Sequence, residues 1–178
     1  MFKKIILALI VLLAGIAVFI ASRPDDFRVE RSILLNAPAP VVFEHINDLR
    51  KSNEWSPWTK IDPNMKQTYE GPAAGVGAKY AWAGNKDIGE GRLEIIESRP
   101  NELVRTNLEF LKPFKATNTA DFTLVPQGGQ TQFTWSMYGK SNFLGKAMSL
   151  VMNCDKMVGD QFEKGFASLK TIVEANRG

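Results

Sequence analysis

The stretch VERSILLNAPAPVVFEHINDLRKSNEWSPW, Val29 to Trp58, predicts a strand, a helix and a tryptophan-bearing connector in immediate succession. Apolar and polar residues alternate between Phe27 and Leu35, which is the period of a half-buried strand, and only Arg31 interrupts the apolar set. Asn36 is expected to cap the following helix, whose first turn tolerates two prolines because no N–H is needed there. Its apolar residues recur at helical spacing until it stops near Asp48 to Arg50.

Turn signals divide the next part of the chain into six short extended runs. The runs are expected at Lys66–Glu70, Ala78–Ala83, Gly89–Ser98, Glu102–Phe110, Ala116–Val125 and Thr131–Tyr138. Their links are too short for the crossover helices that parallel neighbours require. The sequence therefore predicts an antiparallel meander.

The last part of the chain, Asn142 to Asn176, predicts one long helix with a single apolar face. Gly159 and Gly165 each lower helix propensity by about 1 kcal/mol relative to Ala, so we expect them to allow either close packing of the helix against the sheet or a local bend. Cys154 lies in a Met-rich part of this segment and is expected to be a small buried hydrophobe.

The amino terminus is the most apolar part of the chain. Residues 5–22 carry no charge, and as a helix at about 1.5 Å per residue they span roughly 27 Å, close to the hydrocarbon thickness of a bilayer. We expect residues 1–24 to be an uncleaved membrane anchor, with a cleaved signal peptide as the alternative. Lys3 and Lys4 favour an inside amino terminus, a single pass through the cytoplasmic membrane and an extracytoplasmic domain, periplasmic in a two-membrane bacterium.

Composition argues against several classes of function. The formal net charge is +3, and no basic run interleaves with aromatic residues, so nucleic-acid binding is not expected. Cys154 is the only cysteine and His45 the only histidine, and no carboxylates cluster at ligand spacing, which predicts no disulfide, metal site or cofactor. No Gly-x-Ser-x-Gly turn is present, so we assign no catalytic residue.

The order of elements and the wording of several segments resemble one known superfamily. VERSILLNAPAPVVF, GVGAKYAWAGN, IGEGRLEIIESRPN and TQFTWSMYG are similar to the START-like helix-grip superfamily (SRPBCC), in its polyketide cyclase/dehydrase and lipid-transport-like branch. The resemblance covers about Phe27 to Val173. It implies an α+β fold for residues 25–178, in which a curved antiparallel sheet of about seven strands wraps a long carboxyl-terminal helix.

In this superfamily an apolar cavity lies between the sheet and the long helix, which implies a hydrophobic small molecule or lipid as partner. Large aromatic and methionine side chains are the pocket candidates, because they adapt to an irregular occupant. They are Trp55, Trp58, Tyr80, Trp82, Phe110, Phe114, Trp135, Met148, Met152 and Met157. The polar pocket candidates are Glu90, Arg92 and Asp155.

We therefore expect a membrane-tethered, noncatalytic domain that binds a lipid or another hydrophobic molecule. Two alternatives remain open at this stage. One is a cyclase- or dehydratase-like enzyme acting on a hydrophobic substrate through a carboxyl group of raised pKa. The other is a protein-interaction module, as in chaperone-stimulating relatives of the fold.

Overall fold

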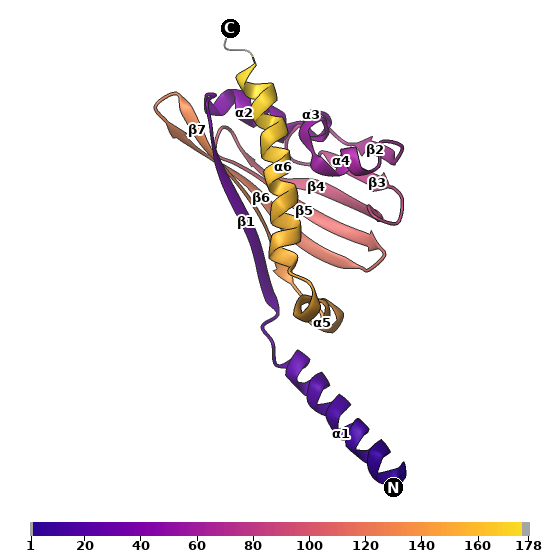
Figure 1. Cartoon of the computed structure of the whole chain (residues 1–178). Helices are drawn as coiled ribbons and strands as arrows, with labels where there is room; N and C mark the ends of the chain where they lie inside the picture. Colours follow the sequence, from indigo (N-terminus) through magenta and orange to yellow (C-terminus); the bar gives the residue numbers. More distant parts are fainter. Residues whose placement is uncertain (1, 176–178) are drawn as a thin grey trace.

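A seven-stranded antiparallel sheet curves around one long helix in the computed structural model, which describes residues 2–175 (Figure 1). The helices are α1 (Phe2–Ala21), α2 (Ala39–Asn47), α3 (Leu49–Trp55), α4 (Pro57–Ile61), α5 (Phe143–Val151) and α6 (Cys154–Glu174). The strands are β1 (Asp26–Leu35), β2 (Lys66–Glu70), β3 (Lys79–Ala83), β4 (Glu90–Arg99), β5 (Leu103–Lys112), β6 (Ala116–Gln127) and β7 (Gln130–Lys140). The predicted α+β helix-grip fold and its antiparallel meander are confirmed.

The sheet has the order β1-β7-β6-β5-β4-β3-β2, so the first strand pairs with the last. Strands β2 to β7 follow one another as hairpins, while α2, α3 and α4 lie in the link that carries the chain from β1 to the far edge. Because facing residues of antiparallel partners share a face, Arg31 lies beside Trp135 on the inner, concave face. Arg31 is therefore the one charged side chain that β1 turns toward α6.

Helix α6 packs against β1 and against side chains of β7, and Phe162 and Phe166 face inward. Both glycines of α6 lie at this contact. A Cβ on Gly165 would come within 3.1 Å of the Trp135 ring and 3.3 Å of Pro57 Cδ, and one on Gly159 would overlap the Arg31 guanidinium. The predicted role of these glycines in close helix–sheet packing is confirmed.

Three details of the predicted helices are wrong. The carboxyl-terminal segment is two helices, because the Asn153 side chain accepts a hydrogen bond from the Lys156 backbone N–H at 2.9 Å and so caps a new helix. Asn36 does not cap α2, which begins after Pro38; its own backbone N–H donates to Glu174 Oε1 at 2.7 Å. Cys154 is exposed at the start of α6. The segment that carries Trp55, for which a short helix or a connector is expected, forms two short helices, α3 and α4. The predicted helix end at Asn176 lies outside the described residues.

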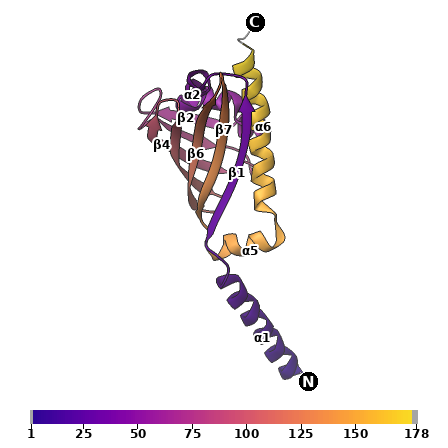
Figure 2. The same cartoon turned by 90° about the vertical axis from the view of Figure 1, so that its left-hand side faces the viewer.

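Helix α1 extends away from the rest of the protein (Figures 1 and 2). It is long and apolar enough to cross a membrane, and nearly all of its side chains are exposed. A signal sequence near an amino terminus has the same length and composition. The helix ends at Ala21, and Asp25 and Asp26 lead directly into β1.

The packing of α6 leads to a stability prediction. Replacing fully buried Phe162 by alanine should lower the free energy of unfolding by about 3–5 kcal/mol, because the cavity under α6 cannot close completely. The matched Phe114→Ala change removes a ring that is 52% exposed and should cost less than about 0.5 kcal/mol. Urea unfolding of the full chain in detergent, followed by tryptophan fluorescence, measures both. Equal losses for the two variants would contradict the packing described.

Candidate functional site

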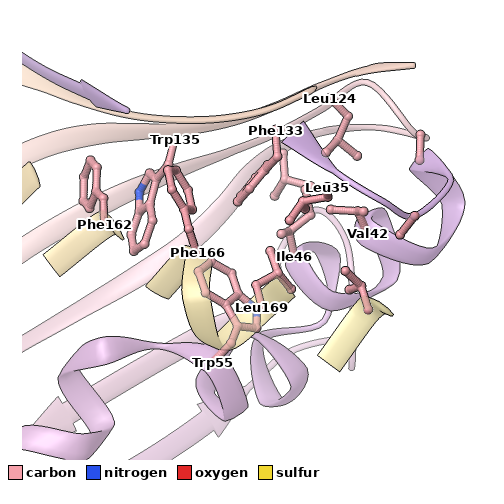
Figure 3. Close-up of a cluster of buried hydrophobic side chains, with 14 of the residues drawn as sticks. Leu35, Val42, Ile46, Trp55, Leu124, Phe133, Trp135, Phe162, Phe166 and Leu169 are labelled. Atoms are coloured by element: carbon pink, nitrogen blue, oxygen red, sulfur yellow. The ribbon is translucent and has the colours of Figure 1, made fainter. Parts of the chain in front are cut away.

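The first group of aromatic side chains on the concave face is packed under α6, and we call it the core cluster (Figure 3). Its members are Trp55, Trp58, Phe122, Phe133, Trp135, Phe162 and Phe166. Trp135 stacks on Phe162 with ring centroids 4.0 Å apart, and Trp55 meets Trp135 edge-on at 5.4 Å. The indole N–H of Trp55 donates to the His45 carbonyl at 2.9 Å. The predicted pocket residues Trp55, Trp58 and Trp135 therefore hold α3, α4 and α6 to the sheet.

A second group continues along the same face beyond α6, and we call it the aromatic row: Tyr69, Tyr80, Trp82 and Phe110. Neighbouring ring centroids lie 5.2, 5.8 and 6.1 Å apart in that order, across β2, β3 and β5. Figure 1 shows α6 running over the β1 side of the sheet, with β3, β4 and β5 extending beyond it. The row thus lies on the part of the concave face that α6 does not cover.

Gly91 explains how Trp82 reaches Phe110 across strand β4. Gly91 pairs with Trp82 on one side and with Phe110 on the other. A Cβ at position 91 would lie 2.3 Å from the Trp82 ring and 2.6 Å from the Glu109 carbonyl oxygen. The missing side chain leaves room for the indole beside the β4 backbone, where its ring meets the Phe110 ring edge-on.

Aliphatic side chains lie beside these aromatic rings. By register, Leu93 of β4 and Leu108 of β5 face each other and lie beside Tyr80 on the concave side. Both leucines are half-buried, as are Trp82 and Phe110. We call Tyr80, Trp82, Leu93, Leu108 and Phe110 together the concave surface. It is apolar, and all of its members except the buried Tyr80 are half-buried, whereas most side chains of the core cluster are buried.

Two polar side chains border the concave surface. Asn118 of β6 faces Leu108, and Thr106 of β5 faces Ile95 of β4, so both lie on the same side of the sheet. The Thr106 hydroxyl donates to the Ala120 carbonyl at 3.3 Å. A mostly apolar surface with a few polar groups at its edge is the usual make-up of a small-molecule site.

The remaining apolar candidates lie at the ends of neighbouring elements. Phe114 is exposed in the link between β5 and β6, and Met157 is exposed on α6. Met148 on α5 and Met152 after it are half-buried. None of the four belongs to the aromatic row.

The polar candidates do not face the concave surface from the sheet. Glu90 and Arg92 alternate with Gly91 and Leu93, so they lie on the convex side. Glu90 accepts a hydrogen bond from Lys112 at 2.7 Å, and Arg92 pairs with Glu109 at 2.7 Å. Their inclusion with the pocket is therefore corrected: a one-residue step along a strand moves a side chain to the opposite face.

Asp155, the third polar candidate, lies at the start of α6 and pairs with Arg31 of β1 at 2.9 Å. The hydrogen bond from Arg31 lowers the pKa of the exposed Asp155 carboxyl. A lowered pKa favours the ionised carboxylate, whereas a general acid at neutral pH would need a raised one. The pair fits a role in fastening α6 to β1.

Two hollows lie on the convex side of the sheet. One of about 520 Å³ surrounds Tyr138 near the start of β1, and one of about 360 Å³ lies over β2 to β5. The second is lined by charged residues, including Lys79, Arg92, Glu94 and Glu109. Placing an apolar ligand in the second hollow would remove the ion pairs Lys79–Glu94 and Arg92–Glu109 from water, which costs free energy. The concave surface is the better candidate for an apolar ligand.

Tyr69, Leu93 and Leu108 were missed by the sequence interpretation, which favoured the largest side chains. The strand register identifies them. Once Trp82 is assigned to the inner face, its partners on β4 and β5, and the alternate residues next to those partners, face inward too. The two leucines lie in GRLEI and TNLEF, where each occupies the central inward position.

The chain from residue 26 to residue 174 matches the family model described as "Polyketide cyclase / dehydrase and lipid transport". No curated protein matches the sequence. Similar solved structures include protein MLL2253 from Mesorhizobium loti, at 13% identity and a TM-score of 0.63, covering 85% of this chain and 100% of that one. Protein CV1439 from Chromobacterium violaceum is 16% identical with a TM-score of 0.60, over 85% and 99% of the two chains.

The Aha1 protein from Colwellia psychrerythraea, whose structure was described as a dimer, is also similar. It is 16% identical with a TM-score of 0.57, over 85% of this chain and 99% of that one. At these identities the structural similarity supports a shared fold and nothing further. The helix-grip architecture is thus shared with proteins of very different sequence.

Burial raises the pKa of Tyr80 to about 12 from an ordinary 10. In the folded state Tyr80 therefore keeps its proton up to a higher pH than in the unfolded chain. The neutral phenol contributes its full share of stability below about pH 10 and loses it as the pH rises toward about 12. The difference in unfolding free energy between wild type and Tyr80→Phe, from urea titrations across this range, should fall with rising pH. A pH-independent difference would contradict the burial of this hydroxyl.

Proposed function

Because the chain belongs to the polyketide cyclase/dehydrase and lipid transport family, we propose that it binds a lipid or another hydrophobic small molecule on its concave surface while α1 tethers it to a membrane. The observation that carries this proposal is the aromatic row beyond α6, in which Tyr69, Trp82 and Phe110 are half-buried and Tyr80 is buried. An apolar surface of this kind gains free energy when a ligand removes it from water, at about 25 cal/mol per Å².

The surface suits an apolar ligand in shape as well as in composition. Trp82 lies against Gly91, and the two leucines beside it add an aliphatic strip. Aromatic faces and aliphatic side chains of this kind contact alkyl chains or fused rings equally well. Asn118 at the border can supply a hydrogen bond that orients a polar end of the ligand.

Binding rather than catalysis is proposed because of where the charges lie. Acid–base chemistry on a bound substrate requires a titratable group within hydrogen-bond reach of the reacting atoms. Glu90 and Arg92 are on the convex side, and Asp155 is held ionised by Arg31. Tyr80 borders the surface, but its raised pKa keeps its hydroxyl neutral near pH 7, as a hydrogen-bond donor and not a base.

The tether belongs to the same proposal. Helix α1 exposes its apolar side chains along its length, as a bilayer-spanning helix does. Lys3 and Lys4 favour an inside amino terminus in the cytoplasmic membrane, with the domain on the outer side. A short link between α1 and β1 would keep the concave surface at high effective concentration near lipid.

A matched pair of substitutions on β4 tests the ligand surface. Leu93→Lys places a charge on the concave surface, whereas Ile96→Lys changes an aliphatic side chain that is already exposed beside a bulge of the same strand. With NBD-labelled palmitate as the probe, Leu93→Lys should weaken binding by at least about tenfold, because the ligand would bury an unpaired charge. Ile96→Lys should bind within about twofold of wild type.

Binding is measured by energy transfer from tryptophan to the probe, using the full chain in nanodiscs, and urea unfolding confirms that both variants are folded. Native mass spectrometry of the wild-type chain should also show a co-purified lipid or hydrophobic molecule. Equal affinity of the two folded variants would exclude the concave surface as the binding site.

A further inference from the structure

Helix α5 turns its apolar face outward. Counted from Phe143, further apolar side chains follow one, four, seven and eight residues later. This spacing places them on one face of the helix, as a single stripe. The large ones are exposed: Phe143 53%, Leu144 43%, Leu150 41% and Val151 84%. A helix on a water-facing surface normally has the opposite arrangement, with its apolar stripe against the core.

The most buried side chain of α5 is a lysine, and this lysine contacts the end of α1. Lys146 is 8% exposed, although Lys is among the residues least often buried. Its ammonium group forms an ion pair with Asp25 and donates to the Ala21 carbonyl at 3.1 Å. Ala21 is the last residue of α1, so α5 is held within one side chain's length of the point where the apolar helix ends.

Both views place α5 at the end of the domain from which α1 leaves (Figures 1 and 2). The segment FLGKAMSLV contains no acidic residue. Its exposed apolar stripe therefore lies beside the end of a helix of bilayer length, and the segment carries no negative charge that anionic headgroups would repel.

We propose that α5 is a second membrane contact, which lies in the lipid–water interface with Phe143, Leu144, Leu150 and Val151 among the acyl chains. The occupant of this apolar face is the bilayer that α1 enters, so the inference rests on the proposed tethering. Amphipathic helices bind membrane interfaces in this way, with the apolar face about 5–10 Å below the headgroups. Since α5 joins β7 to α6, this contact would fix the concave surface at the lipid boundary.

The experiment uses the full chain in liposomes of phosphatidylcholine and phosphatidylglycerol. The exposed native cysteine is removed by Cys154→Ser, and an NBD fluorophore is attached to one new cysteine at a time. Val151→Cys reports on α5, Leu12→Cys on α1, and Thr171→Cys on the exposed side of α6. All three positions are exposed, so the label displaces no packed side chain. Brominated acyl chains quench labels within the bilayer, and iodide quenches labels in water.

Brominated lipid should quench the labels at positions 12 and 151 several-fold more than the label at 171, and iodide should show the reverse order. If position 12 is quenched but position 151 is open to iodide, α1 is inserted and the inference alone fails. Protection of position 151 from both quenchers would place protein, such as a second copy of the chain, over α5 and would also overturn it. Failure of position 12 to be quenched would overturn the tethering and the inference together.

Discussion

The stacking of Phe162 on Trp135 determines where α6 lies, and the position of α6 determines which part of the sheet stays open. Strands are spaced about 4.8 Å apart, so a sheet of seven strands is roughly 30 Å wide. A helix with its side chains is only about 10–12 Å across and covers two or three strands. With α6 fixed over β1 and β7, strands β3 to β5 extend beyond its reach. The concave surface follows from this mismatch in width.

The two faces of the sheet differ in how they meet water. On the convex side, Arg105 pairs with both Glu97 and Asp121, and Arg92 pairs with Glu109. Such partly exposed ion pairs contribute little to stability, but they keep this face hydrated and unsuited to an apolar ligand. On the concave side the only charge that β1 contributes, Arg31, is neutralised by Asp155 and by Glu163 at 3.6 Å. The two faces therefore differ in their suitability for the proposed apolar ligand.

The fold was largely predictable from sequence because strand alternation and turn residues are local signals. All seven strands lie within two or three residues of their predicted positions, and Gly159 and Gly165 mark the helix–sheet contact as expected. The break before α6 was missed because Asn153 looks like an ordinary polar residue until its side chain is seen to cap Lys156. That cap contributes only about 1 kcal/mol, and the apolar pattern continues across it, so the pattern by itself indicates a single helix.

The site was less predictable, because the same residue types serve the core and the candidate surface. Trp55 and Trp82 are equally suited to either role by composition, and only the three-dimensional position of α6 separates them. The polar candidates failed for a different reason: Glu90 and Arg92 are adjacent in sequence to inward residues, and the pleat sends them outward. The exposure of the apolar stripe of α5 could not be predicted either, since its sequence pattern resembles that of any amphipathic helix.

The central proposal is that a hydrophobic ligand lies against β3 to β5, on the side of the sheet that faces α6. Photocrosslinking of the full chain in membranes with a diazirine-bearing lipid, followed by mass spectrometry of the peptides, tests it most directly. We expect adducts on Trp82, Leu93, Leu108 or Phe110, which an excess of unlabelled ligand abolishes. Adducts confined to α1, or equally frequent on convex residues such as Arg92 and Thr119, would contradict it.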